Sequence, residues 1–272
     1  MEKLLYSNQS KEMKKTMIIT SVRPSLMGRF IDSFNEREMS KKGWGIALMT
    51  QRYTPEELQA TLQKDVTNSI NVISSNHRIP PYIAKATLIE NNPSDIYCCL
   101  DDDCVLLETV DYETPIEFVQ QNYVGIVSCN WVRFNTPKMM AKKNIVNEYK
   151  KQKIVFTGGG MLFSKKVGNI ISMKPRVNWL FDDVQFSIDS YTSGFVNYRY
   201  LGSVIEHNIV TKGGIKTLYN ETQMTVNDSK YITLIKSKDQ YQFENSYYMP
   251  RDSALTQYSN NLHKDINENI QK

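Results

Sequence analysis

The sequence has little of what would place the protein in a membrane or an oxidising compartment. No stretch approaches the roughly 18 apolar residues of a membrane-spanning helix, and the amino terminus lacks the apolar centre of a signal peptide. The four cysteines (Cys98, Cys99, Cys104 and Cys129) lie on apolar, strand-like segments without the C-x-x-C spacing of a zinc site. We therefore expect a cytoplasmic protein with no integral membrane segment and with reduced, buried cysteines.

Two common ligand-binding motifs and internal repeats are also missing. The chain has no G-x-x-x-x-G-K-[ST] loop, which excludes a Walker-type nucleotide site. An EF-hand beginning at Asp101 would need a further Asp or Asn at Val105 followed by glycine, and neither is present. The 272 residues are 40% apolar and 23% charged, as in ordinary globular proteins. We expect a core domain at 1–214 and a carboxyl-terminal extension at 215–272 that packs on it.

The most distinctive stretch is an apolar run, 96–107, interrupted by Asp101, Asp102 and Asp103. The mostly apolar residues before Asp101 predict a buried strand, so the aspartates follow its carboxyl end, where open α/β sheets bind ligands. Adjacent carboxylates repel one another, and a divalent cation relieves that repulsion. Oxygen ligands favour Mg²⁺ or Mn²⁺, which can also bind a diphosphate. The alternative is a solvated acidic turn.

Strands and helices alternate in the first hundred residues. Strands are predicted at 16–22, 44–50 and 96–100, and apolar residues recur at helical spacing from Leu26 to Phe34. A second helix begins at the cap residue Thr54 and continues to about residue 73, and a shorter one covers 82–90. This alternation predicts an α/β fold with a doubly wound, parallel sheet. The loop after the first strand presents hydroxyl groups and a cation at a strand end (Thr20, Ser21 and Arg23).

The second half of the chain adds three candidate site segments. A glycine run, Gly158, Gly159 and Gly160, interrupts a strand-like segment at 154–163 and indicates a bend or the close approach of a ligand. Trp179 precedes Asp182 and Asp183, where a helix is expected to begin, although acidic residues at such positions are often only caps. Gly194 ends that helix, and a strand at 195–205 leads to His207 and to a basic loop containing Lys212. A lone histidine is more often a core or surface residue than a ligand.

Basic residues are concentrated in one block. Between Arg133 and Arg176 there are eleven Lys or Arg residues and a single acid, Glu148, so this block has a net charge of +10. The whole chain has a net charge of +4, and the remainder is therefore net −6. Such a block favours a polyanionic partner, and the alternative is an ordinary solvated face.

The order of these motifs resembles that of the GT-A fold glycosyltransferases, over residues 16–214. The resemblance implies a mixed, mainly parallel Rossmann-like sheet flanked by helices, and a nucleotide-sugar bound through Mn²⁺ or Mg²⁺. It implies metal ligands at Asp103, Asp101 and His207, and a general base at Asp183 or Asp182. Many members have Glu-Asp where this chain has Asp-Asp. The expected donor-side residues are Thr20, Ser21, Arg23, Arg78, Lys85, Asp101, Asp102 and Lys212. The expected acceptor-side residues are Gly158, Gly159, Gly160 and Trp179.

The chemistry of these residues agrees with sugar transfer. A metal offsets charge on a departing nucleoside diphosphate, and a carboxylate can take the proton of an attacking hydroxyl. With no evident covalent nucleophile, we expect inversion by a hexosyl- or pentosyltransferase using a UDP-sugar. The basic block resembles a feature of base J glucosyltransferase-like enzymes, which implies duplex DNA with 5-hydroxymethylpyrimidine as acceptor and a flipped base. The alternatives are a surface polysaccharide or lipid transferase and a non-catalytic nucleic-acid-binding protein.

Overall fold

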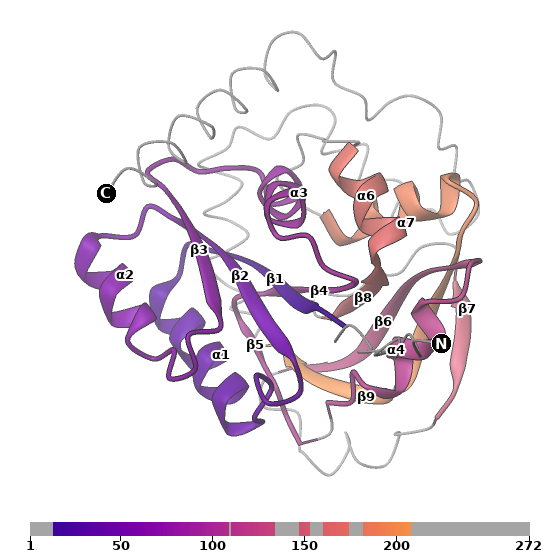
Figure 1. Ribbon diagram of the computed structural model, residues 1–272, viewed down its shortest axis with the longest axis horizontal. Coiled ribbons are helices and arrows are strands. Elements are labelled where there is room, and N and C mark those ends of the chain that lie inside the picture. Colours follow the sequence, from indigo (N-terminus) through magenta and orange to yellow (C-terminus); the bar gives the residue numbers. More distant parts are fainter. Residues whose placement is uncertain (1–12, 109, 134–146, 153–159, 174–181, 208–272) are drawn as a thin grey trace, which may run out of the picture.

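The computed structural model describes residues 13–108, 110–133, 147–152, 160–173 and 182–207, and all structural statements below concern these residues (Figure 1). The strands are β1 (Lys15–Ser21), β2 (Trp44–Gln51), β3 (Ile70–Ser75), β4 (Ile96–Asp101), β5 (Cys104–Val105), β6 (Val124–Arg133), β7 (Tyr149–Gln152), β8 (Met161–Ser164) and β9 (Val196–His207). The helices are α1 (Pro24–Glu36), α2 (Pro55–Leu62), α3 (Pro81–Asn91), α4 (Thr114–Val119), α6 (Lys165–Met173) and α7 (Asp182–Thr192).

The described strands form one mixed sheet in the order β3-β2-β1-β4-β8-β6-β9-β5, with β7 paired to β9. Strands β3, β2, β1 and β4 are parallel to one another, and β6 and β9 form a second parallel pair. Between these two groups, β8 runs antiparallel to both β4 and β6. The predicted fold class, a mixed and mainly parallel sheet flanked by helices, is confirmed.

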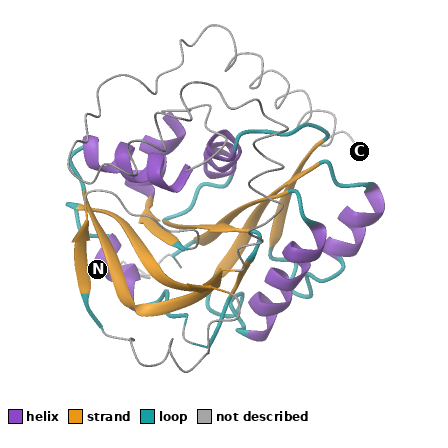
Figure 2. Ribbon diagram, turned by 180° about the vertical axis from the view of Figure 1, so that it is seen from behind, coloured by secondary structure: helices purple, strands orange, loops and turns teal. Residues whose placement is uncertain are grey.

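Helices cover both faces of the sheet (Figures 1 and 2). On one face, Met17 and Ile19 of β1 pack in a core cluster with residues of α1 and α4. On the other face, Ile18 packs with residues of α3, α6 and α7. Alternate side chains of a strand point to opposite faces, so the buried run of β1 serves both layers. This double cover explains why its sequence is continuously apolar.

The register of the central strands sets the position of the aspartates. In the parallel pairing of β1 with β4, Thr20 lies opposite Asp101, and in that of β1 with β2, Ser21 lies opposite Thr50. The loops after these three strands therefore leave the sheet at the same edge. That edge is where open α/β sheets bind ligands.

The predicted helix from Thr54 to about residue 73 is wrong in its second half. Its start is confirmed, because Thr54 and Glu57 form a capping box, but the helix ends at Leu62 and residues 70–75 form edge strand β3. The carboxylate of Asp65 accepts hydrogen bonds from the backbone N–H groups of Ser69 and Ile70, at 3.1 and 2.9 Å. This side-chain-to-backbone turn competes with helix and directs the chain into the strand.

The other sequence expectations have mixed outcomes. The strands at β1, β2, β4 and β9 and the helices at α1, α3 and α7 are confirmed, and Gly194 follows α7 with a φ of 90°. Helices α4 and α6 and strand β7 were not predicted from the sequence. All four cysteines are free and buried, as predicted. No helix in the described part of the chain is long and apolar enough to cross a membrane. The predicted extension at 215–272 lies outside the described residues.

One glycine allows α6 to approach the aspartate strand closely, and it provides a test of the fold. A Cβ on Gly168 would lie 2.7 Å from the ring of Tyr97, a buried residue of β4. We predict that Gly168→Ala lowers the free energy of unfolding by about 1–3 kcal/mol, because the ring has no room to move. Chemical denaturation monitored by circular dichroism would measure it.

Gly28→Ala in α1 is the matched control for this change. There the nearest atom to an added Cβ is Cε of Lys64, a flexible side chain, at 3.1 Å. This substitution should be neutral or stabilise the protein by up to about 1 kcal/mol, because alanine favours helix. Equal effects of the two substitutions would contradict the close packing of α6 on β4.

Candidate active site

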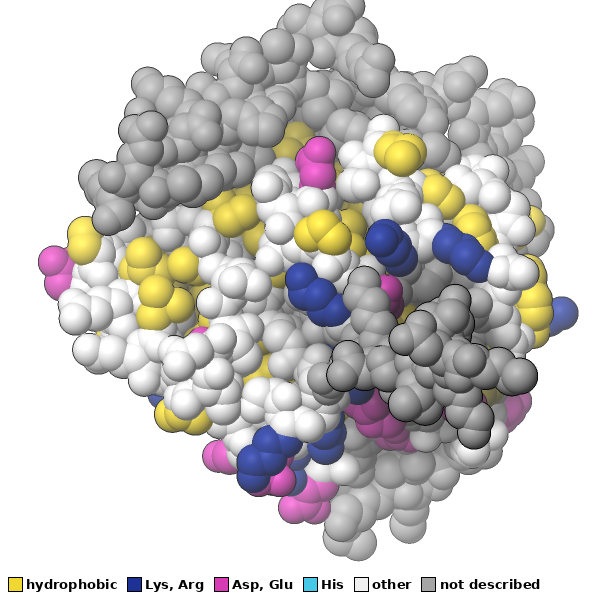
Figure 3. Space-filling view, viewed as in Figure 1, with side chains coloured by type: hydrophobic (Ala, Val, Ile, Leu, Met, Phe, Trp, Pro, Cys, Tyr) yellow, Lys and Arg dark blue, Asp and Glu magenta, His cyan; other side chains and the backbone are white. Residues whose placement is uncertain are grey.

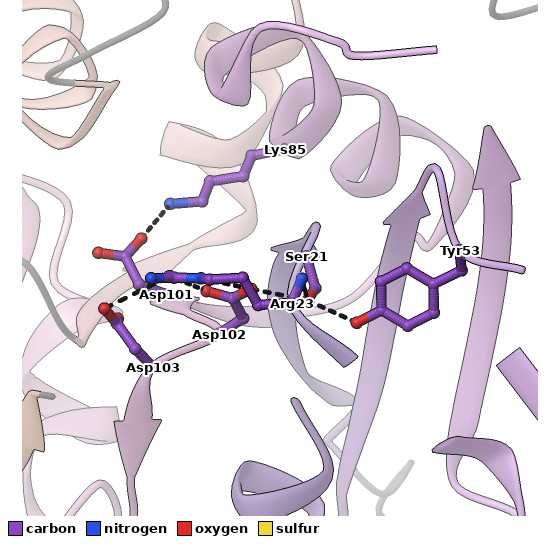
Figure 4. A network of polar contacts seen from close by, with 7 residues as sticks. All are labelled: Ser21, Arg23, Tyr53, Lys85, Asp101, Asp102 and Asp103. Carbon is purple, nitrogen blue, oxygen red and sulfur yellow. Dashed lines mark hydrogen bonds and ion pairs between the residues drawn. The ribbon is translucent and has the colours of Figure 1, made fainter. Parts of the chain in front are cut away.

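Polar and charged side chains from separate elements meet at the carboxyl edge of the parallel strands (Figure 4). Ser21 ends β1, and Arg23 directly precedes α1. Asp101 ends β4, and Asp102 and Asp103 form the turn into the short strand β5. Three of these positions are successive in sequence, and the parallel register brings the other two to them.

Asp102 is the most enclosed of the three aspartates, with 3% of its surface exposed. Ser21 Oγ and Arg23 Nε both donate hydrogen bonds to its Oδ2, at 2.7 and 3.3 Å, and the guanidinium also contacts Oδ1. Burial raises the pKa of Asp102, and the charge of Arg23 acts in the opposite direction. Both carboxylate oxygens are thus engaged within the protein.

The network extends from Asp102 to a tyrosine that the sequence analysis missed. The phenol of Tyr53 lies 2.6 Å from Ser21 Oγ. Because Ser21 gives its own proton to Asp102, Tyr53 is the donor in this contact. Burial raises the pKa of the Tyr53 phenol, which keeps its proton. Its position just after β2 offered a signal, since the residues that follow neighbouring parallel strands meet at one edge.

Arg23 connects the two later aspartates. Its guanidinium lies 3.3 Å from Oδ2 of Asp103, in addition to its contacts with Asp102. Burial opposes the charge of Arg23, but Asp102, and to a smaller extent Asp103 and Asp101, raise its pKa above the ordinary value. Asp103 is itself buried, with 7% exposed.

Lys85 of α3 joins the first aspartate to α7. Its side chain is 4% exposed, and its Nζ donates to Asp101 Oδ1 at 3.1 Å and to Asp182 Oδ2 at 2.7 Å. Burial favours the neutral amine, but the two carboxylates outweigh it and raise the pKa of Lys85. The acidic start of α7 is therefore held beside the aspartate turn.

The protein's own cations, Arg23 and Lys85, already offset the charges of Asp102 and Asp101, so mutual repulsion alone does not require a divalent ion. Among the described residues, no group of three His, Cys, Asp or Glu side chains forms a ready metal site. The donor set still fits Mn²⁺ or Mg²⁺. Asp101 and Asp103 offer carboxylate oxygens, which these ions prefer. The β5–β9 register pairs the backbone of His207 with that of Cys104, the residue that follows Asp103 in the sequence.

The remaining predicted residues are only partly described. Thr20 lies beside Asp101 in the sheet, and Arg78 lies between β3 and α3. Gly160 is buried with a φ of 82°, and an added Cβ would lie 3.1 Å from the Tyr112 hydroxyl, so its environment is packed core. Asp183 lies in the first turn of α7. Gly158, Gly159, Trp179, Lys212 and the side chain of His207 lie outside the described residues.

Four lysines of the basic block have described side chains, and all are exposed: Lys150, Lys151, Lys165 and Lys166. The first pair is on β7 and the second begins α6. On the face shown in Figure 3, the described basic side chains are spread over several places and are not gathered in one patch. The described basic side chains therefore neither support nor contradict the prediction that DNA is the acceptor.

Comparison with known proteins identifies the fold. No protein-family model and no curated protein sequence matches this chain. Among solved structures, the mannosyltransferase PcManGT from Pyrobaculum calidifontis, in complex with GDP-Man and Mn²⁺, has a TM-score of 0.58 at 12% identity. That match covers 82% of this chain and 65% of the other. GalNAc-T7 with UDP, GalNAc and Mn²⁺ has a TM-score of 0.59 at 11% identity. It covers 92% of this chain and 54% of the other.

This chain thus spans somewhat under two thirds of the first protein and about half of the second. Both similar proteins are transferases that were crystallised with Mn²⁺ and a nucleotide. At these identities the similarity concerns the fold. The mixed sheet and its flanking helices have the GT-A fold.

Proposed function

We propose that this protein is a metal-dependent glycosyltransferase that moves a sugar from a nucleotide-sugar to a hydroxyl acceptor. One observation carries the proposal: Lys85 holds Asp101, at the end of β4, together with Asp182, at the start of α7. A donor-side carboxylate and an acceptor-side acidic pair therefore lie at one edge of the sheet. The shared GT-A fold and the nucleotides bound by its two structural neighbours support the same activity.

On the donor side, Asp103, Asp101 and His207 would hold Mn²⁺ or Mg²⁺. The bound ion supplies Lewis-acid stabilisation of the departing nucleoside diphosphate, which we propose is UDP. The cations Arg23, Arg78 and Lys212 add positive charge for the diphosphate, and Thr20 lines the strand end. Both oxygens of Asp102 are engaged, which favours a role in shaping the turn.

On the acceptor side, we assign the general base to Asp183. The ion pair of Asp182 with Lys85 gives Asp182 a positioning role, and Asp183 is the other acid in the first turn of the same helix. A base on the acceptor side without a covalent nucleophile favours inversion of configuration. We expect the sugar to be a hexose or pentose. The proposed acceptor-side residues are Gly158, Gly159 and Trp179, whereas the packed surroundings of Gly160 do not favour such a role.

The first test concerns the donor. Asp103→Asn should abolish the stabilisation by Mn²⁺ and UDP together, because an amide binds a divalent cation poorly. For the wild type, ligands at 100 times their Kd would raise the free energy of unfolding by about 2.7 kcal/mol. Thermal unfolding with and without both ligands measures the effect. Asp32→Asn, at a half-exposed carboxylate on α1, is the control and should respond as the wild type does.

The same thermal-unfolding experiment also separates a nucleotide-sugar enzyme from a protein that only binds nucleic acid. An undiminished shift by Mn²⁺ and UDP in Asp103→Asn would exclude Asp103 as a ligand. A wild-type protein that shows no shift with any nucleoside diphosphate and Mn²⁺ would contradict the donor site as a whole.

For the acceptor, we propose 5-hydroxymethylpyrimidine in duplex DNA, supported by the charge of the basic block. Cations that contact phosphates release counterions, so affinity should fall with log salt at a slope of about −0.9 per neutralised phosphate. Each lysine removed from the true footprint should reduce that slope by about one. We expect this for Lys142→Ala/Lys143→Ala and Lys150→Ala/Lys151→Ala, measured by fluorescence anisotropy across a salt series.

Lys41→Ala/Lys42→Ala is the matched control, since both lysines are exposed and lie outside the block. Transfer from a panel of nucleotide sugars to hydroxymethylated and unmodified duplexes completes the experiment. Salt-independent binding with no sugar on any modified base would favour a surface polysaccharide or lipid acceptor instead.

The two acids of α7 should have separable effects. Asp183→Asn should lower kcat by about 10²- to 10⁴-fold and leave Mn²⁺-dependent UDP binding unchanged, because the base acts on the acceptor. Asp182→Asn should instead lower the melting temperature, because buried Lys85 loses a partner. Transfer to the identified acceptor and thermal unfolding give the two readouts. Wild-type turnover in Asp183→Asn would contradict its role as the base, and an unchanged melting temperature in Asp182→Asn would contradict the structural role of its ion pair.

A further inference from the structure

The side chain of Arg23 lies between two of the three aspartates (Figure 4). One guanidinium nitrogen contacts both Asp102 and Asp103, and Nε donates a further hydrogen bond to Asp102. The main chain of Arg23 is fixed, because its N–H donates to Ser21 Oγ and its carbonyl accepts from two N–H groups in the first turn of α1. Its side chain is 37% exposed and thus reaches the surface of the site.

Asp103 is also the residue that we assign as the principal metal ligand. A guanidinium paired with its Oδ2 and a divalent cation on the same carboxylate would repel each other. Asp102 is differently placed, because both of its oxygens are enclosed by Arg23 and Ser21. The contact of Arg23 with Asp103 is therefore the one that a metal would disturb.

We propose that Arg23 takes the place of the metal on Asp103 until the donor arrives, and then turns to the diphosphate. This inference rests on the proposed function and concerns the order in which the site is filled. An arginine suits both states, because its planar fork binds carboxylate and phosphate oxygens equally well. Release of Asp103 by the diphosphate makes room for the metal. Metal and nucleotide then strengthen each other's binding by the same factor.

The test is a titration of Mn²⁺ alone and with UDP, read from the electron paramagnetic resonance signal of the free ion. In Arg23→Gln, Mn²⁺ alone should bind roughly fivefold or more tightly than in the wild type, a factor within the usual range of such coupling. The enhancement by UDP should fall correspondingly. Arg29→Gln is the matched control, because it removes the same charge from an exposed position of α1, and it should behave as the wild type.

Removal of Arg23 alone leaves Asp102 buried without its cation and can unfold the protein. The variant Arg23→Gln/Asp102→Asn removes both charges and keeps an acceptor for Ser21, and it should show the same gain in affinity for Mn²⁺. If the wild type binds Mn²⁺ and UDP together but neither folded variant binds Mn²⁺ more tightly, the inference is wrong and the proposed function stands. If the wild type binds neither ligand, the proposed function fails and this inference with it.

Discussion

Three adjacent carboxylates at the end of a buried strand are the constraint on which the rest of this site depends. Two cationic side chains, one at the start of α1 and one on α3, offset the negative charge of these carboxylates. Arg23, at the start of α1, contacts Asp102 and Asp103, and Lys85 of α3 contacts Asp101. The ionised aspartates are thereby compatible with burial, since a paired charge is far less costly than an isolated one.

The sequence was sufficient for the central strands because their signal is local. Continuous apolar runs predict doubly covered strands, and β1, β2 and β4 are of this kind. Edge strand β3 is only partly buried, and its residues follow a well-capped helix, so the helical prediction extended too far. The turn at Asp65 that separates the two depends on side-chain hydrogen bonds, which periodicity does not reveal. Short elements such as α4 and β7 are held by tertiary packing and have too few residues for a periodic pattern.

The sequence identified most residues of the candidate site but not the contacts between them. Strand ends identified Ser21, Arg23 and the aspartates, and the acidic pair before an apolar helix identified Asp182. That Lys85 joins Asp101 to Asp182 depends on the packing of α3 against α7, over separations of 16 and 97 residues. Tyr53 was missed because its only signal is its position after β2, which it shares with every other residue of that loop. Its role appears only when the parallel register places the loops after β1 and β2 together.

The double attachment of Lys85 has a consequence for how the chain acquires its structure. Strands β1 to β4 and helix α3 are complete by residue 101, whereas Asp182 follows 81 residues later in the chain. Until α7 docks, Lys85 has only one of these two carboxylates, and burial of a lysine with incomplete compensation is unfavourable. The amino-terminal half therefore does not by itself supply both ion-pair partners of the buried Lys85. The helix that carries Asp182 thus completes the ion-paired environment of a lysine that lies in the amino-terminal half of the chain.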